Sequence, residues 1–160
     1  MSVMANYPLL LQLAGKRVCV IGGGAVATRR TRALIEAGAR VSVISPTATE
    51  QLLALPVDWH ERAYADGDLA GAWLVHAATD DPDVNAAVAA EAEREHIWCI
   101  RADDAAHSPA WVPAVLRDGD ITVAVNAGRN PGVAKAVRDG VREVLPQILA
   151  AVPPTVRRVD

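Results

Sequence analysis

A run of closely spaced glycines near residue 22 is the first part of the sequence able to do chemistry. Gly22-x-Gly24-x-x-Ala27 directly follows the apolar run 16–21 and opens a segment with helical spacing. Glycines in such a turn let the backbone approach a pyrophosphate, and the helix amino terminus offers that anion unpaired N–H groups and partial positive charge. The motif predicts a dinucleotide site, and the alternative is a merely structural turn.

The acidic residue that often binds a ribose about twenty residues after such a motif is missing here. The next strand-like run ends at Ser45-Pro46-Thr47, and we interpret Glu50 as the partner of Thr47 in a helix capping box. An arginine that would hold a 2′-phosphate is also missing from that strand end. Spacing alone therefore leaves the choice between NAD and NADP open.

A second group of reactive side chains follows the apolar run 97–101 and consists of Arg101, Asp103, Asp104 and His107. Ligands of open parallel sheets bind outside the carboxyl ends of the strands, where a carboxylate is able to act as a general base. The alternative is a loop whose aspartates cap turns and whose histidine is exposed. Both interpretations stay open at this stage.

The end of the run 72–77 brings a third candidate contact. Thr79 is placed to touch a cofactor, whereas Asp80 and Asp81 are better explained as capping residues of the helix that begins at Pro82. Within that helix we expect Glu91 to face water together with its charged neighbours.

Alternating strand-like and helix-like segments must position these side chains. Apolar, β-branched runs predict strands at 16–21, 40–45, 57–62, 72–77 and 97–101, and helical spacing predicts helices between most of them. Strands without polar alternation, separated by helices, are typical of a parallel sheet covered on both faces. Residues 16–101 therefore predict a doubly wound α/β domain.

The pattern changes after residue 101. Two strand-like runs, 112–117 and 121–126, flank Asp118-Gly119-Asp120 and predict a hairpin. Asn130-Pro131-Gly132 begins a helix that we expect to end near Leu145, because Pro146 interrupts it. We therefore expect a domain of residues 1–111 and an appendage of residues 112–160, whose segment 152–155 is typical of a tether.

Composition excludes several classes of function. Sixteen Lys and Arg against nineteen Asp and Glu give a net charge of −3, which disfavours a nucleic-acid or anionic-membrane surface. No apolar run approaches the roughly 20 residues that span a bilayer, and the first residues lack the features of a signal peptide. Cys19 and Cys99 lie in apolar runs without metal-ligand spacing, so we expect buried thiols, no metal site and a cytoplasmic protein.

Several stretches together resemble one known family. They are GGGAVATRR at 22–30, EAGA at 36–39, AWLVHAATDD at 72–81 with Asn85, IWC at 97–99, Asp103 and Pro113. In these the chain resembles precorrin-2 dehydrogenase, the dehydrogenase part of sirohaem synthase, over nearly its whole length.

The resemblance implies a Rossmann-like sheet followed by a hairpin and helix through which members form homodimers. It implies an enzyme that uses NAD to oxidise the tetrapyrrole precorrin-2 to sirohydrochlorin in sirohaem biosynthesis, with iron insertion at the same site in some members. A fused or separate methyltransferase is a further implied partner.

The resemblance also implies roles for single residues. Cofactor contacts fall on Gly22, Gly23, Gly24, Ala25, Val26, Pro46 and Thr47. The essential carboxylate falls on Asp103, whereas Asp104 does not hold the matching place. Ile100, the stretch 108–111 and the stretch 126–129 depart from the family pattern and bear on substrate contacts and chelation. Two alternatives remain: a non-catalytic NAD-sensing module, as in potassium transporter regulation, and a scaffold that has lost catalysis.

Overall fold

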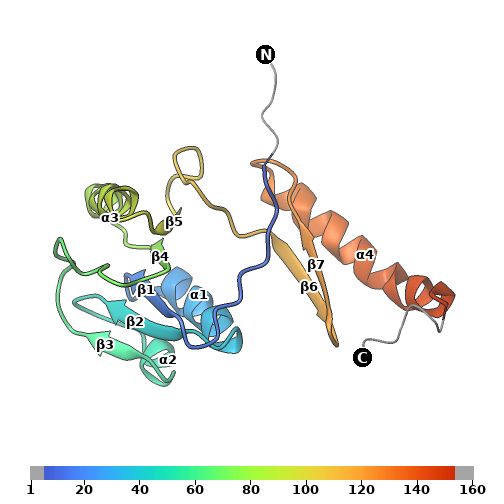
Figure 1. Cartoon of the computed structure of the whole chain (residues 1–160), viewed down its shortest axis with the longest axis horizontal. Coiled ribbons are helices and arrows are strands. Elements are labelled where there is room, and N and C mark those ends of the chain that lie inside the picture. The colour runs from blue at the N-terminus through green and yellow to red at the C-terminus, as the bar shows by residue number, and fades with distance from the viewer. Residues whose placement is uncertain (1–5, 154–160) are drawn as a thin grey trace, which may run out of the picture. The chain divides into compact units, whose positions relative to one another are not determined.

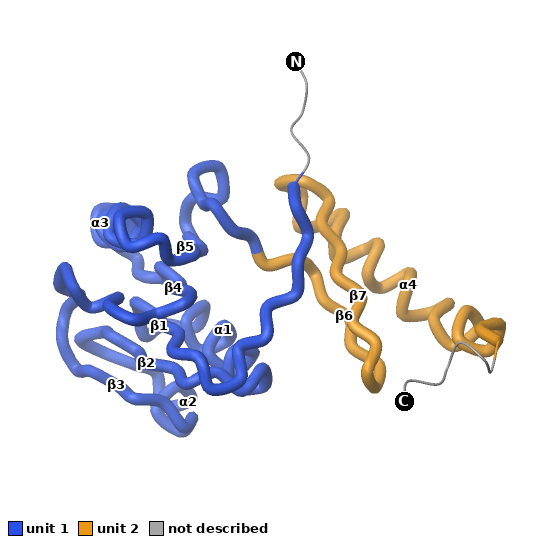
Figure 2. The backbone as a smooth tube through the Cα atoms, viewed as in Figure 1, with its two compact units in different colours: residues 1–111 blue, residues 112–160 orange. Residues whose placement is uncertain are grey.

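The computed structural model describes residues 6–153, which fall into two compact units that divide between Trp111 and Val112 (Figures 1 and 2). The first unit is a parallel sheet with helices, and the second is a hairpin with one long helix. In the described part of the chain no helix is long and apolar enough to cross a membrane.

The sheet of the first unit has five strands in the order β3-β2-β1-β4-β5. They are β1 (Arg17–Ile21), β2 (Arg40–Ile44), β3 (Asp58–His60), β4 (Leu74–Ala77) and β5 (Trp98–Arg101). Every neighbouring pair runs parallel. The strand order reverses between β1 and β4, so the predicted doubly wound parallel sheet is confirmed.

Two hydrophobic clusters cover the two faces of this sheet. Alternate residues of β1 point to opposite sides: Cys19 packs in the cluster that holds Val88 of α3 (Pro82–Arg94), and Val20 packs in the cluster that holds Ala27 of α1 (Ala25–Glu36). Cys99 is buried like Cys19, as the sequence predicted, and burial raises the pKa of both thiols to about 11. Both are therefore protonated packing residues at neutral pH.

Three sequence predictions about helices in this unit are wrong, those for Thr47, Glu91 and Asp80. The short helix α2 (Glu50–Leu53) is capped by Thr49, whose hydroxyl accepts from the Leu52 N–H, so Thr47 forms no capping box with Glu50. Glu91 is only 2% exposed and not solvated, because the link between β3 and β4 lies over that side of α3. The expected cap of α3 by Asp81 is confirmed, whereas Asp80 does not cap it.

The second unit pairs β6 (Ala114–Asp118) with β7 (Ile121–Val125) in an antiparallel hairpin, as predicted. Gly119 in the turn has a φ of +56°, which favours glycine. The helix α4 (Pro131–Ala151) continues through Pro146, so the expected end near Leu145 is wrong. A proline inside a helix removes one backbone donor and crowds the carbonyl four residues earlier, and the packing of the buried Leu145 beside it offsets this cost. The predicted tether at 152–155 lies partly outside the described residues.

The buried His76 on β4 predicts a pH-dependent stability. Burial, followed by the charge of Arg30, lowers the pKa of His76 from an ordinary 6.5 to about 4. Between these values the unfolded chain binds the extra proton, so the free energy of unfolding falls as the pH drops from about 6.5 towards 4. The loss from this group approaches about 3 kcal/mol.

Urea unfolding of the wild type and of His76→Leu at pH 7 and pH 4.5 checks this expectation. The variant should lose less stability in acid than the wild type. An equal loss in both proteins would show that His76 does not carry the effect.

Candidate functional site

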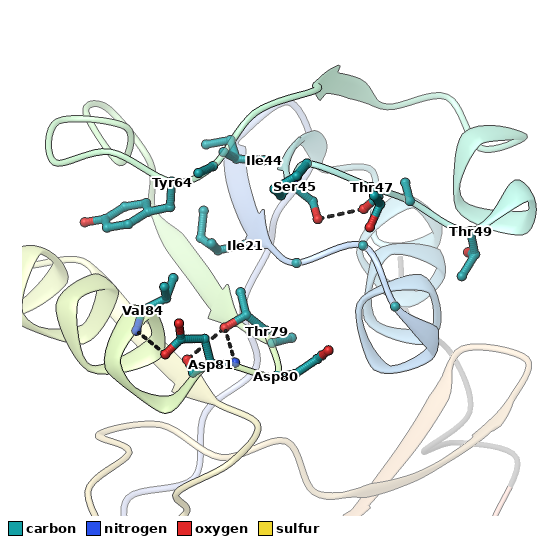
Figure 3. Close-up of a pocket in the computed structure, with 17 residues that line it drawn as sticks. Ile21, Ile44, Ser45, Thr47, Thr49, Tyr64, Thr79, Asp80, Asp81 and Val84 are labelled. Carbon is teal, nitrogen blue, oxygen red and sulfur yellow. Dashed lines mark hydrogen bonds between the residues drawn. The ribbon is translucent and has the colours of Figure 1, made fainter.

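The glycine turn 22–24 joins β1 to α1 at the carboxyl edge of the sheet and lines a cavity of about 550 Å³ (Figure 3). The other walls come from the segments that follow β2, β3 and β4. These include Pro46, Thr47 and Thr79, so the structure brings these three predicted contacts together with the glycines around one cavity. Ala25 and Val26, the other two predicted contacts, lie in the first turn of α1 directly after Gly24.

The first two glycines allow three backbone segments to approach one another. A Cβ at Gly22, whose φ is +122°, would overlap the carbonyl of Ala78, and a Cβ at Gly23 would overlap the carbonyl of Thr47. Only glycine therefore fits at these positions without moving the segments after β4 and β2.

Gly24 differs from its two neighbours because a Cβ there would meet open space. It is the N-cap of the 12-residue helix α1, and among the described residues no side chain caps that end. The first N–H groups of α1 are therefore available to an anion, and the helix dipole favours negative charge there. This open cradle beside a large cleft fits the pyrophosphate of a dinucleotide.

Two threonines that sequence analysis missed fasten the segment after β2 to the glycine turn. The hydroxyls of Thr28 on α1 and Thr49 are 2.8 Å apart, and the Thr49 N–H donates to the carbonyl of Gly23 at 3.0 Å. These bonds hold Pro46 and Thr47 in the cavity wall. Their only sequence signal is the capping preference of threonine, which does not reveal a partner 21 residues away.

Thr79 lies in the wall that follows β4, and its polar groups are already engaged. Its N–H and hydroxyl lie 3.1 and 2.8 Å from the side-chain oxygen of Asn85, a completely buried residue of α3. The amide of Asn85 also donates to the Thr79 carbonyl at 3.0 Å. Asn85 therefore fixes the backbone of this wall, and Thr79 contributes shape more than a free hydroxyl.

Asp103 follows β5 at the same edge of the sheet. Ala77 and Arg101 are partners in the β4–β5 register, and the Ala102 N–H donates to the Ala77 carbonyl at 2.9 Å. The guanidinium of Arg101 donates to both carboxylate oxygens of Asp103, at 3.2 and 2.8 Å. The Asp103 side chain keeps 27% of its surface exposed, so it is accessible to a ligand.

This pairing sets the protonation state of Asp103. The hydrogen bonds from Arg101, with a smaller contribution from Asn85, hold the pKa of Asp103 below its usual range although partial burial opposes them. The carboxylate is therefore ionised at neutral pH and able to accept a proton or a hydrogen bond.

The other two members of the cluster have a different local role. The Asp104 carboxylate accepts from the backbone N–H groups of Ala106 and His107, at 3.1 and 3.2 Å, and lies 2.8 Å from the His107 ring. The His107 side chain is 79% exposed. The turn-capping interpretation thus describes Asp104 and His107. Arg101 donates its hydrogen bonds to Asp103 and lies 3.7 Å from Asp104 as a second, longer ion pair. The described His, Cys, Asp and Glu residues form no group of three that could bind a metal ion.

Sequence analysis named Ser108 only as part of the stretch 108–111 and did not predict its hydrogen bonds. Its buried hydroxyl accepts from the Arg101 N–H at 3.0 Å and donates to the Ala110 carbonyl at 2.8 Å. It thereby ties the loop after β5 back to the end of the strand that carries Arg101.

Comparisons with known proteins place these features in context. A family model described as "Putative NAD(P)-binding" matches residues 9–114. The chain is 37% identical to Siroheme synthase 1 of Aeromonas salmonicida over 93% of its own length and 33% of that protein. It is 34% identical to Siroheme synthase of Xylella fastidiosa over 91% of its length and 32% of that protein. The chain therefore spans about a third of the length of these curated relatives.

A solved structure named "SirC, precorrin-2 dehydrogenase" has a similar fold, with a TM-score of 0.77. The matched region covers 86% of this chain and 70% of the chain in the solved structure, at 24% sequence identity. The fold that the two proteins share therefore includes residues beyond the parallel sheet.

The glycine geometry predicts opposite results for two neighbouring substitutions. Gly23→Ala should lower the free energy of unfolding by about 1–3 kcal/mol, because the added methyl group overlaps the Thr47 carbonyl. Gly24→Ala should leave stability nearly unchanged, because its methyl group enters open space. Chemical denaturation measures both, and an equal loss in the two variants would contradict the close approach at Gly23.

The Arg101–Asp103 pair predicts a change in a titration. Arg101→Gln removes the charged donor, so the pKa of Asp103 should rise towards its ordinary value. Carbon-13 NMR of the Asp103 carboxyl carbon measures the midpoint in both proteins. A midpoint unaltered by the substitution would mean that Arg101 does not govern this carboxylate.

Proposed function

The chain belongs to the NAD(P)-binding family, and on that premise we propose that it is an NAD-dependent dehydrogenase that oxidises precorrin-2 to sirohydrochlorin. One observation carries the proposal: the open cradle at the start of α1 and the Arg101-held carboxylate of Asp103 follow strands at the same edge of one sheet. The names of the curated relatives and of the structural neighbour support the choice of substrate.

The lining of the cavity favours NAD over NADP. None of the described residues that line it is a lysine or an arginine, so a 2′-phosphate would meet no cation there. Arg62, just after β3, already forms a salt bridge to Asp68 at 2.6 Å. The N–H groups of Ala25 and Val26 would hold the pyrophosphate, with Pro46, Thr47 and Thr79 forming the walls around the rest of the nucleotide.

Asp103 would act as the general base of the reaction. When bound, NAD supplies the acceptor for the hydride that leaves the reduced macrocycle. Asp103 takes the proton released with that hydride, so the two electrons and both hydrogens are accounted for. Arg101 keeps the carboxylate ionised and oriented for this transfer.

The second unit would form the homodimer. Val133, Val137, Val144 and Ile148 share one face of α4, and each is between 43% and 51% exposed. A helix face with this much exposed apolar surface is typical of an interface, and a second copy of the chain is the partner that the family resemblance implies.

Substitution of Asp103 tests the catalytic proposal. Asp103→Asn should reduce turnover by roughly 10²–10⁴-fold, because the amide cannot accept the proton, while the affinity for NAD stays unchanged. The measurement is an anaerobic absorbance assay with precorrin-2 generated in situ and NAD, which follows sirohydrochlorin and NADH together.

Asp104→Asn is the matched control, because it removes the neighbouring carboxylate and should retain turnover. A wild-type rate in Asp103→Asn would remove the role assigned to this residue. Wild-type protein that binds NAD without any turnover would favour the NAD-sensing module instead. Ferrous ion added after the oxidation tests whether the same protein also inserts iron.

A further inference from the structure

Glu91 is a buried carboxyl group that the proposed reaction does not use. It lies on α3, is 2% exposed and has no salt bridge to any described residue. One carboxyl oxygen accepts from the Leu69 N–H at 3.0 Å, and the other accepts a hydrogen bond from the Tyr64 hydroxyl. Burying a carboxyl group is costly unless hydrogen bonds compensate it, so this pair of donors accounts for its position.

Both donors belong to the link between β3 and β4, residues 61–73. This link contains no helix, although parallel strands are usually joined through one. Its shape therefore depends on backbone turns and on side-chain bonds, among them the ion pairs Arg62–Asp68 and Arg94–Asp66. The exposed Arg94–Asp66 pair contributes little. The link is therefore held at two places, by the bidentate pair of Arg62 with Asp68, whose side chain is 12% exposed, and by the bonds to the buried Glu91.

The same link forms one wall of the candidate cofactor cavity through Ala63 and Tyr64. Figure 3 shows Tyr64 near Ile21, Ile44 and Val84, away from the wall that carries Thr47 and Thr49. Together these four side chains give the cavity an apolar region suited to a flat ring. Burial and the hydrogen bond to Glu91 raise the pKa of Tyr64 well above its ordinary value, so the hydroxyl remains a donor at neutral pH.

The strand order indicates which end of a dinucleotide this wall would meet. Asp103 follows the edge strand β5, and the glycine cradle follows the central strand β1. A nicotinamide that reaches a substrate at Asp103 therefore extends from β1 towards β5, and the adenosine half extends the other way, towards the segments after β2 and β3.

We propose that Glu91 is a positioning residue for the dinucleotide, acting through Tyr64 and Leu69 to hold the wall that receives its adenosine half. This inference rests on the proposed function. Glu91 touches neither cofactor nor substrate, and its effect is to keep the 63–69 segment in the arrangement that binds.

Three variants at or near this position separate its role from general packing. Glu91→Ala leaves two donors, the Leu69 N–H and the Tyr64 hydroxyl, without an acceptor. We expect the 63–69 segment to keep its binding arrangement in only about a tenth of the molecules, which raises the Kd for NAD about tenfold. Glu91→Gln should stay within about twofold, because its amide oxygen accepts from Leu69 and its amide nitrogen donates to the Tyr64 oxygen. Glu93→Ala, an exposed glutamate on the same helix, is the control and should not change the Kd.

Two further readouts distinguish positioning from loss of fold. The KM for NAD should rise in Glu91→Ala while kcat at saturating NAD stays at the wild-type value, because Asp103 and Arg101 are untouched. Hydrogen exchange of the Leu69 amide, measured without nucleotide, should accelerate in Glu91→Ala and not in Glu91→Gln. If Glu91→Ala does not fold, Tyr64→Phe removes only the hydroxyl and should raise the Kd about threefold.

The outcomes separate this inference from the function on which it rests. A folded Glu91→Ala with faster exchange at Leu69 and an unchanged Kd overturns the inference and leaves the dehydrogenase intact. An unchanged Kd in Tyr64→Phe, where that variant is needed, does the same. Wild-type protein without measurable affinity for NAD overturns both.

Discussion

The close approach of three backbone segments at the carboxyl edge of the sheet is the constraint on which the rest of the first unit depends. Gly22 and Gly23 leave no room for a side chain against the carbonyls of Ala78 and Thr47. This contact brings the ends of β1, β2 and β4 together and at the same time leaves Gly24 facing open space. The three consecutive glycines thus have two roles. Gly22 and Gly23 allow the backbone segments to pack closely, and Gly24 beside them leaves space for an anion at the start of α1.

Buried and half-buried polar residues hold the walls around that cradle in place. Asn85 holds the backbone at Thr79, Thr28 and Thr49 hold the segment after β2, and Glu91 holds the link after β3. In each case a side chain forms a hydrogen bond to a segment that has no regular secondary structure at that point. Since buried hydrogen bonds are costly to break, these walls are pre-arranged, and a ligand need not order them on binding.

The elements themselves were predictable because their signals are local. Apolar runs predicted every strand of the parallel sheet, the Asp118-Gly119-Asp120 turn predicted the hairpin, and Asp81-Pro82 predicted the start of α3. The capping box at Thr47 and the helix end at Pro146 were wrong, because in both places the local preference was outweighed by other contacts. Ser45 donates to the Thr47 carbonyl at 2.7 Å, and Leu145 is buried beside the proline.

The sequence alone determined the strands of the parallel sheet, the hairpin and the position of the glycine turn, since the signal for each lies within a few residues. Only the tertiary structure decided that Asp103 is paired with Arg101 while Asp104 caps a turn, because both patterns suit the same spacing. It alone also decided that Glu91 is buried, since the donors Leu69 and Tyr64 lie 22 and 27 residues earlier in the chain. Helical periodicity records which side of a helix a residue occupies, but not which distant segment covers that side.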